Sequence, residues 1–415
     1  MTPATLTWSP LREEALNRLH AFAPKTGASY AKQRNFDFGM GKHDKVSRLS
    51  PWLRHRIITE NEVLSATLDH FNPREAEKFI QEVFWRGYFK GWLEHRPDVW
   101  SHYKSDLVAL VDRLEQDAVL AREYDTAISG QTGIACFDAW ASELMATGYL
   151  HNHARMWFAS IWIFTLKLPW QLGADFFYRH LLDGDPASNT SSWRWVAGLH
   201  TVGKTYLARA DNIQKFTAGR FAPNGQLATM ADALEDPRTV SINAPKYVTP
   251  DLVGRRFGLL VTEEDCHPES LAPLKPDAVL VLTERTPRSV PPLGEKSAIF
   301  ASEALSHRAQ SFEPYFGVDV SVQKGGGWSD ILSEWMGTNN LEACVTSRLP
   351  LGPVARRTRR ACREAGIELL EITRVYDQCA WPHAKRGFFG LKKKIPQILS
   401  EIGLENADAR PATLI

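Results

Sequence analysis

Two short segments decide the fold of this chain. They are Leu150-His151-Asn152-His153-Ala154-Arg155-Met156 and Leu182-Asp183-Gly184-Asp185-Pro186-Ala187-Ser188-Asn189, and Ser192-Trp193-Arg194-Trp195-Val196 follows the second. Asn152, Arg155 and Met156 stand at i, i+3 and i+4, so a helix would place them on one face. Polar groups that converge beside large aromatic residues suit a flat, polar-edged, redox-active ring better than a metal or a nucleophile.

The charges in these segments predict a specific contact. A buried arginine needs a carboxylate, and a buried carboxylate needs a cation or hydrogen-bond donors. We therefore predict that Arg155 pairs with Asp183. Trp193 and Trp195 are two residues apart, so on a helix they point about 200° apart and cannot serve the same surface.

The length, net charge and cysteine content exclude several classes of protein. The 415 residues are enough for two domains, and the net charge of +1 gives no general attraction to nucleic acid. Five scattered cysteines form no CxxC pair, so we expect free thiols and no metal site. The first ten residues lack a signal pattern, and no run of about 18 apolar residues occurs. We expect a cytoplasmic protein without a membrane span.

The pattern of apolar residues changes after a polar segment rich in Pro and Gly at 222–255. Short apolar runs at 257–262, 278–283, 318–322, 341–346 and 368–372 alternate with helical patterns at 296–312, 329–337 and 352–366. Strands that alternate with helices predict a parallel α/β sheet. No G-x-G-x-x-G follows the first run, so the sequence does not support an NAD site.

The order TG-x4-D from Thr132, LHN-x2-RM, LLDGD-x3-N and W-x-W resembles the flavin-binding helical domain of the DNA photolyase and cryptochrome family. The resemblance spans roughly residues 26–221, and the chain looks like a divergent bacterial member of that family. It implies an all-helical FAD-binding domain at 1–245 and a small parallel α/β antenna-like domain at 246–415. The family has the α/β domain first, so we expect a circular permutation of the two domains. Residues 387–394 resemble the element that joins the two domains in the family, which suggests the same rearrangement.

The resemblance also implies which residues bind FAD. Asp185 would accept a hydrogen bond from the imide edge of the flavin ring, Asn189 would lie near a protonatable ring nitrogen, and Arg155 with Asp183 would lie against the ring face. The remaining cofactor residues would be Tyr30, Ser47, Leu49 and Ser50 at the diphosphate, together with Arg86 and Asn152. Taken alone, the segment Ser47 to Pro51 is an ordinary capping segment, with Ser50 as the candidate cap.

A substrate site and an electron path are implied in the same way. The family's lesion cavity would here be lined by Glu82, Trp85, Asn152, Met156 and Trp195. Catalysis would involve Trp193 and Trp170 as electron carriers, with Asn189 and Glu82. The third carrier stays open between Tyr124, Trp140 and Trp162. Any one of these tryptophans, taken singly, would indicate core packing.

Several positions depart from the family pattern. Val46 replaces a usual threonine, Gly87 a usual acidic residue and His153 a usual arginine, which weakens a phosphate contact at neutral pH. Lys204, Arg209, Lys215 and Arg220 could bind DNA phosphates or form a solvated face.

Three functions remain open at this point. The first is blue-light-driven, FAD-dependent repair of pyrimidine dimers in DNA by an enzyme, deoxyribodipyrimidine photo-lyase, with electron transfer from reduced flavin to a flipped-out lesion. The second is a cryptochrome-type photoreceptor without repair, and the third is a flavin-bearing binding module without a light function. Asn189 and Met156 favour repair. A monomer is expected, and a second antenna chromophore, a folate or a deazaflavin, is possible.

Overall fold

The structure is a computed structural model that describes residues 8–404, except 248, 284–288, 290 and 292–293. Residues 1–7, which belong to the stretch searched for a signal pattern, lie outside the described residues. The tail from 405 onward also lies outside them.

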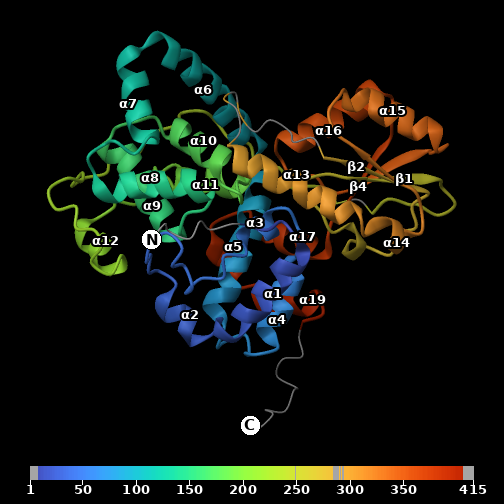
Figure 1. Ribbon diagram of the computed structural model, residues 1–415, viewed down its shortest axis with the longest axis horizontal. Helices are drawn as coiled ribbons and strands as arrows, with labels where there is room; N and C mark the ends of the chain where they lie inside the picture. Colours follow the sequence, from blue (N-terminus) through green and yellow to red (C-terminus); the bar gives the residue numbers. More distant parts are fainter. Residues whose placement is uncertain (1–7, 248, 284–288, 290, 292–293, 405–415) are drawn as a thin grey trace, which may run out of the picture.

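A helical body comes first in the chain (Figure 1). Its elements are α1 (Arg12–Phe22), η1 (Ala23–Lys25), α2 (Ala28–Gln33), α3 (Ser50–Arg54), α4 (Glu60–Leu68), α5 (Glu77–Glu94), α6 (Pro97–Gln116), α7 (Ala118–Ile128), α8 (Ala135–Thr147), α9 (Asn152–Ser160), η2 (Ile161–Thr165), α10 (Trp170–His180), α11 (Pro186–Val196) and α12 (Ala210–Phe216). The helical half of the predicted fold is confirmed.

Local signals explain where these helices begin. Thr59 and Glu62 form a capping box at the start of α4, which satisfies two backbone donors. Asp185 caps α11, with Pro186 in the first turn. α4 and α5 are separate helices, and in the turn between them Oδ1 of Asn72 accepts from the backbone N–H groups of Arg74 and Glu75.

The second part is a sheet of five parallel strands in the order β3-β2-β1-β4-β5. Its elements are β1 (Phe257–Val261), η3 (Pro268–Ser270), β2 (Ala278–Leu282), α13 (Glu295–Ala309), α14 (Phe312–Phe316), β3 (Val320–Gln323), α15 (Trp328–Thr338), β4 (Ala343–Ser347), α16 (Pro353–Glu364) and β5 (Leu369–Ile372). The predicted runs and the parallel sheet are confirmed. The three inner strands are buried along their whole length, as expected when helices cover both faces.

Different helices cover the two faces of the sheet. Phe300 and Leu305 of α13 join the strand residues Leu259 and Val279 in the core that continues into the helical body. On the other face, α15 and α16 pack against Leu260 and neighbouring strand residues in a separate core. The sheet therefore lies against the helical body through α13 (Figure 1).

The last described helices return to the helical body. These are α17 (Val375–Ala380), η4 (Trp381–His383), α18 (Phe388–Lys392) and α19 (Ile395–Glu401). α17, η4 and α18 pack against α5, and α19 packs against α17. A hypothetical side chain at Gly91 of α5 would meet the backbone of Trp381 at 2.8 Å, so this contact is close. In space, residues 375–401 thus accompany the helical body, although we grouped them by sequence with the α/β part.

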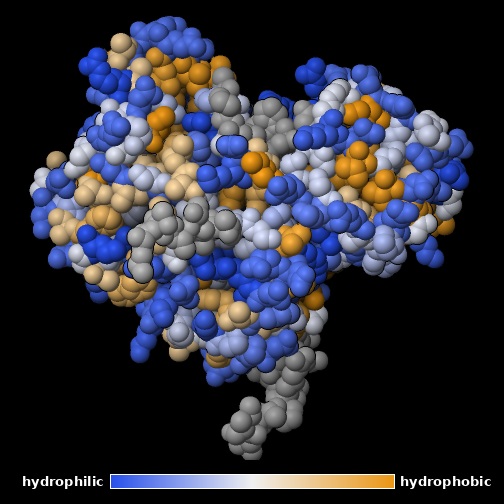
Figure 2. All heavy atoms as spheres, in the orientation of Figure 1, coloured by the Kyte–Doolittle hydropathy of each residue, from blue (hydrophilic) through white to orange (hydrophobic). Residues whose placement is uncertain are grey.

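The segment 217–256 contains no helix or strand among its described residues and wraps around both parts. Asn243 exchanges hydrogen bonds with His95, and Leu234 donates to the carbonyl of Ala197. The visible face in Figure 2 is largely hydrophilic, with apolar atoms near α6 and α7, where Val108 and Val119 are exposed. Among the described helices, none combines the length and apolarity that a membrane crossing requires.

Candidate functional site

The two segments that opened the sequence analysis meet in the helical body. Arg155, in the first turns of α9, donates from Nη2 to Oδ2 of Asp183 at 2.9 Å, and its Nε donates to the carbonyl of Leu150 at 2.8 Å. The predicted ion pair is confirmed. It is mostly buried, with side-chain exposures of 23% for Arg155 and 6% for Asp183.

Asp185 lies at the centre of a cluster of cations. One oxygen, Oδ1, accepts from the backbone N–H groups of Ala187 and Ser188 and caps α11. The other oxygen, Oδ2, has three nitrogens at 3.8 Å, which come from Arg54, Arg86 and Lys90. A separation of 3.8 Å is too long for a hydrogen bond, so the charges attract without being directly bonded.

Several polar atoms of this cluster have no hydrogen-bond partner within the described chain. They are Nε and Nη2 of Arg86, Nζ of Lys90, Oδ1 of Asp183 and Oγ of Ser188. Buried polar atoms are normally satisfied, because an unsatisfied one costs about 1–3 kcal/mol. Free donors beside free acceptors fit a bound group that carries both, which is the character of a flavin ring edge, and the free donors alone would also suit a phosphate. The residues present therefore fit FAD.

The charges shift the acidities of the cluster. Burial alone would raise the pKa of Asp185, but the positive charges of Lys90, Arg86 and Arg54 bring it below its usual range. Burial lowers the pKa of Lys90, and Asp185 offsets part of that effect. At neutral pH the aspartate is ionised, and of the three cations that it faces, Arg54 is also bonded to Glu264 and Arg86 also lies 3.8 Å from Glu60.

The residues assigned to the diphosphate lie on α2 and at α3. Tyr30 is buried, with its ring against Phe22 and Phe79 at centroid distances of 6.2 and 5.1 Å. Leu49 is also buried, whereas Ser47 and Ser50 are half-buried. Ser50 is the first residue of α3, and Leu49 at the cap position provides no side-chain bond, so the expectation that Ser50 caps the helix is wrong.

The remaining polar residues of the site differ in exposure. Asn152 is exposed at the start of α9, and Nδ2 of Asn189 donates to the carbonyl of Ala174 at 2.7 Å. His153 donates from Nδ1 to the carbonyl of Asn35 and stacks on Trp157 at 4.0 Å. Burial lowers the pKa of His153, so it carries no charge at neutral pH.

The residues assigned to the lesion cavity lie on three helices. Glu82 of α5 pairs with Arg34 at 2.5 Å. Trp85, one turn later, stacks on Phe388 of α18 with the centroids 3.8 Å apart and the planes 12° apart. Trp195 of α11 stacks on Tyr206 at 5.5 Å, and Met156 of α9 is half-buried. One face of Trp85 is therefore covered by a ring that the sequence analysis did not connect with it.

Trp193 and Trp195 do serve different surfaces, as the spacing predicts. Trp193 is buried, and the ring nearest to it among the tryptophans is Trp162, at a centroid distance of 6.2 Å. Trp162 in turn lies 6.1 Å from Tyr124. Trp170 contacts Tyr103 at 5.6 Å. Trp140 stacks on Trp157 at 5.4 Å, outside this series.

Some site residues were missed from the sequence. Lys90 lies one turn after Arg86 on α5, so the i, i+4 spacing could have identified it. Arg54 gives no such signal, because its bidentate partner Glu264 lies 210 residues away, at 2.7 and 2.8 Å. The basic residues proposed for DNA are partly neutralised, since Arg209 pairs with Asp211 and Arg220 with Asp37.

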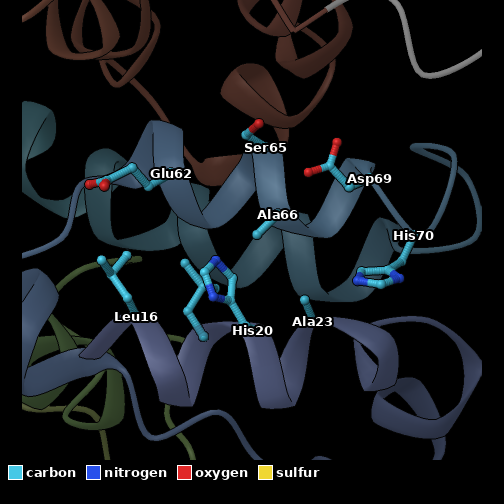
Figure 3. A pocket seen from close by; sticks show the side chains of 9 residues that line it. Leu16, His20, Ala23, Glu62, Ser65, Ala66, Asp69 and His70 are labelled. Carbon is cyan, nitrogen blue, oxygen red and sulfur yellow. The ribbon is translucent and has the colours of Figure 1, made fainter. Parts of the chain in front are cut away.

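Two further features lie apart from this site. Asp37, His43 and Glu143 bring potential metal ligands within 4.8 Å of one another, but His43 already bonds Glu143 at 2.6 Å, and Asp37 accepts from Trp140. A groove of about 400 Å³ runs between α1 and α4 (Figure 3). The groove is lined by Leu16, Leu19, His20, Ala23, Glu62, Ser65, Ala66, Asp69 and His70, none of which was assigned to the flavin or the lesion.

Comparison with known proteins identifies the helical body. Residues 79–229 match the family described as the FAD binding domain of DNA photolyase. Residues 79–229 form a domain of the DNA photolyase and cryptochrome family. FAD is the cofactor of that domain.

Individual relatives cover only part of the chain. The deoxyribodipyrimidine photo-lyase of Alkalihalophilus pseudofirmus is 29% identical over 236 residues, which are 52% of this chain and 44% of that protein. The photo-lyase of Streptomyces griseus is 34% identical over 184 residues, 41% of this chain and 39% of that protein. A class III photolyase structure from Agrobacterium tumefaciens is 26% identical, covers 52% of this chain and 46% of its own, and has a TM-score of 0.43. The chain spans less than half the length of these relatives.

Proposed function

We propose that this protein uses FAD and blue light to split pyrimidine dimers in DNA. The observation that carries the proposal is the partly unsatisfied cluster around Asp185 and Asp183, which lies in the matched domain. Its free donors and acceptors are the kind that a flavin completes. The relatives named as photo-lyases support the same activity.

The residues of the chain would each have a defined part. Bound FAD, once reduced and excited, supplies the electron that opens the dimer. Arg86 and Lys90 would hold negatively charged or acceptor atoms of the cofactor, and the Arg155–Asp183 pair would orient it. The free donors of Arg86 and Lys90 would favour a reduced, more negative ring.

The substrate would enter beside α5 and α11. We assign Glu82, Trp85, Asn152, Met156 and Trp195 to the lesion and Asn189 to the cofactor side. Trp85 and Trp195 provide aromatic faces for stacking on a flipped base, which offsets part of the cost of unstacking it. Phe388 covers one face of Trp85, so either the other face serves the lesion or α18 moves when DNA binds.

The same contact favours a second function. If Phe388 stays on Trp85 and the other face of that ring does not receive a base, the lesion loses a stacking partner, and a cryptochrome-type photoreceptor without repair becomes the better description. We also keep as proposals the division at 245/246 and the circular permutation of the two domains.

The first test concerns the cofactor. Purified protein is expected to be yellow, with FAD released on denaturation. Asp185→Ala is expected to lose it, because Arg86 and Lys90 lose the buried carboxylate that they face and α11 loses its cap. Met145→Ala, an exposed position on α8, is the matched control and should keep the colour. A colourless wild type that cannot be reconstituted with FAD would refute both light-driven functions.

The second test separates repair from sensing. Reduced protein is illuminated with an oligonucleotide that contains a cyclobutane dimer or a 6-4 photoproduct, and restored thymines are counted. Repair that is lost in Glu82→Ala and Trp195→Ala, with flavin retained, is the expected result. Photoreduction without any repair of either lesion would leave the photoreceptor function, and repair unaffected by both substitutions would show that the cavity is misplaced.

A further inference from the structure

Helix α18 carries two adjacent aromatic residues in opposite environments. Phe388 is 5% exposed and stacks on Trp85 of α5. Phe389, the next residue, is 75% exposed. A single exposed ring is common on protein surfaces, so the groups around Phe389 decide whether it has a function. The helix is thus anchored by one ring and presents the other to solvent.

Unpaired cations surround the exposed ring. Residues 378–400 contain five lysines and arginines and no aspartate or glutamate. Lys385, Arg386 and Lys393 are exposed, and their side chains have neither an ion pair nor a hydrogen bond to any part of the chain that the structure describes. Lys392 pairs with Glu77, and Lys394 bonds Gln397. In a chain with a net charge of +1, this segment is a local concentration of positive charge.

The main chain of this segment is held in place. The hydroxyl of Tyr88 donates to the carbonyl of Arg386 at 2.9 Å, and Nη2 of Arg96 donates to the carbonyl of Lys385 at 2.5 Å. The side chains of Lys385 and Arg386 therefore extend from a backbone that is fixed to the helical body. A fixed backbone reduces the ordering cost when a ligand binds.

We propose that residues 385–394 form a nucleic-acid-binding surface. Lys385, Arg386 and Lys393 would neutralise backbone phosphates, and Phe389 would stack on an unpaired base next to them. Cations that follow a backbone beside an aromatic ring are the usual means of binding a single strand. The inference extends the proposed function, because α18 lies directly on Trp85, where the opened DNA strand would arrive.

An anionic membrane would also attract these cations, but the structure favours nucleic acid. Insertion into a bilayer surface needs a broad apolar helix face. α18 has five residues, and two of its apolar side chains, Phe388 and Leu391, are buried against the protein. Phe389 alone offers one ring, which suits a stacked base better than a lipid interface.

The test measures binding of an undamaged, fluorescein-labelled single-stranded oligonucleotide to the full chain in the dark, by anisotropy over a series of salt concentrations. Removing three phosphate contacts in K385A/R386A/K393A should lower the slope of log Kd against log salt by about 2. Phe389→Ala should weaken binding about tenfold at every salt concentration and leave the slope unchanged. The matched control K275A/K296A/K324A removes three exposed lysines of the α/β part and should bind like the wild type.

Each other outcome overturns the proposal. Wild-type binding by both surface variants would show that DNA binds elsewhere. Binding to phosphatidylserine vesicles without binding to the oligonucleotide would assign the surface to lipid. A repair assay on the same variants separates this inference from the proposed function: a protein that binds DNA through 385–394 but repairs no lesion refutes only the latter.

Discussion

Two charged clusters meet at Arg54, and they differ in how well they are satisfied. On the sheet side, Arg54 holds Glu264 with two bonds of 2.7 and 2.8 Å, and Arg374 holds Asp265 with two bonds of 2.7 Å. On the side of α11, the three contacts of Asp185 Oδ2 are all 3.8 Å. We call the first cluster closed, because its charges are joined by direct hydrogen bonds, and the second open, because its charges face one another without them.

The difference indicates separate purposes. Arg374 also donates to Ser270 and to the carbonyl of His267, so its guanidinium is fully used in joining β5 to the loop after β1. Such a set of bonds fastens parts of a protein together. Lys90 Nζ has no bond to any described residue, and a protein keeps such a group when something else completes it. An ion cluster is therefore a candidate binding site when it is incomplete.

Breaking the closed cluster should have the largest effect. Arg374→Ala removes two charged hydrogen bonds from the buried carboxylate of Asp265 and leaves it only one cation, Arg56, at 3.6 Å, so the free energy of unfolding should fall by about 3–5 kcal/mol. Urea denaturation followed by circular dichroism measures this. Arg360→Ala removes an exposed pair with Glu364 and should leave the free energy of unfolding nearly unchanged. Equal losses for the two variants would contradict the distinction between the clusters.

Substitution in the open cluster should have the opposite sign. Lys90→Met removes a buried ammonium that has no bond, so the flavin-free protein should be unchanged or stabilised, by up to about 3 kcal/mol. The same variant should retain less FAD, measured as the ratio of absorbance at the flavin band to that of the protein. Destabilisation as large as that of Arg374→Ala would mean that Lys90 stabilises the fold and is not kept for a ligand.

Acid should lower the free energy of unfolding through two buried histidines. Burial lowers the pKa of His267, near the closed cluster, to about 4, and that of His200, beside α5, to about 4. The unfolded chain binds these protons near pH 6.5 and the folded chain does not, so stability is full above that pH and falls as pH drops toward 4. Each histidine contributes about 1.4 kcal/mol per pH unit in this window. His200→Gln should flatten the profile of unfolding midpoint against pH, and an unchanged profile would contradict the shift.

The smallest effect concerns the aromatic series next to Trp193. Because Trp162 is in ring contact with Trp193, Trp162→Phe should slow flavin photoreduction more than Trp170→Phe, and Trp193→Phe should slow it most. The rate of photoreduction is measured by the fall in flavin absorbance during continuous blue illumination. Trp328→Phe, in the α/β part, controls for general damage to the protein. A larger loss for Trp170→Phe would favour the path expected from the family.

The sequence predicted what local pattern encodes. Strand runs were found because buried parallel strands are continuously apolar, and the Arg155–Asp183 pair was found because both charges lie in short, helix-spaced motifs. Pairs between distant segments were not found. Arg54 with Glu264 and Trp85 with Phe388 are separated by hundreds of residues, and no periodicity connects such partners. The flavin contacts of Asp185 and Asn189 remain predictions, since they depend on a ligand.

The return of residues 375–401 to α5 has a consequence for how the protein is made. When residue 216 has been synthesised, the surface of α5 that will receive α17 and α18 is still uncovered, because the whole sheet must be translated first. At roughly 5–20 residues per second, the intervening stretch of about 160 residues takes on the order of ten to thirty seconds. During that delay the face of α5 that carries Trp85 lacks the ring of Phe388, which covers it in the finished protein.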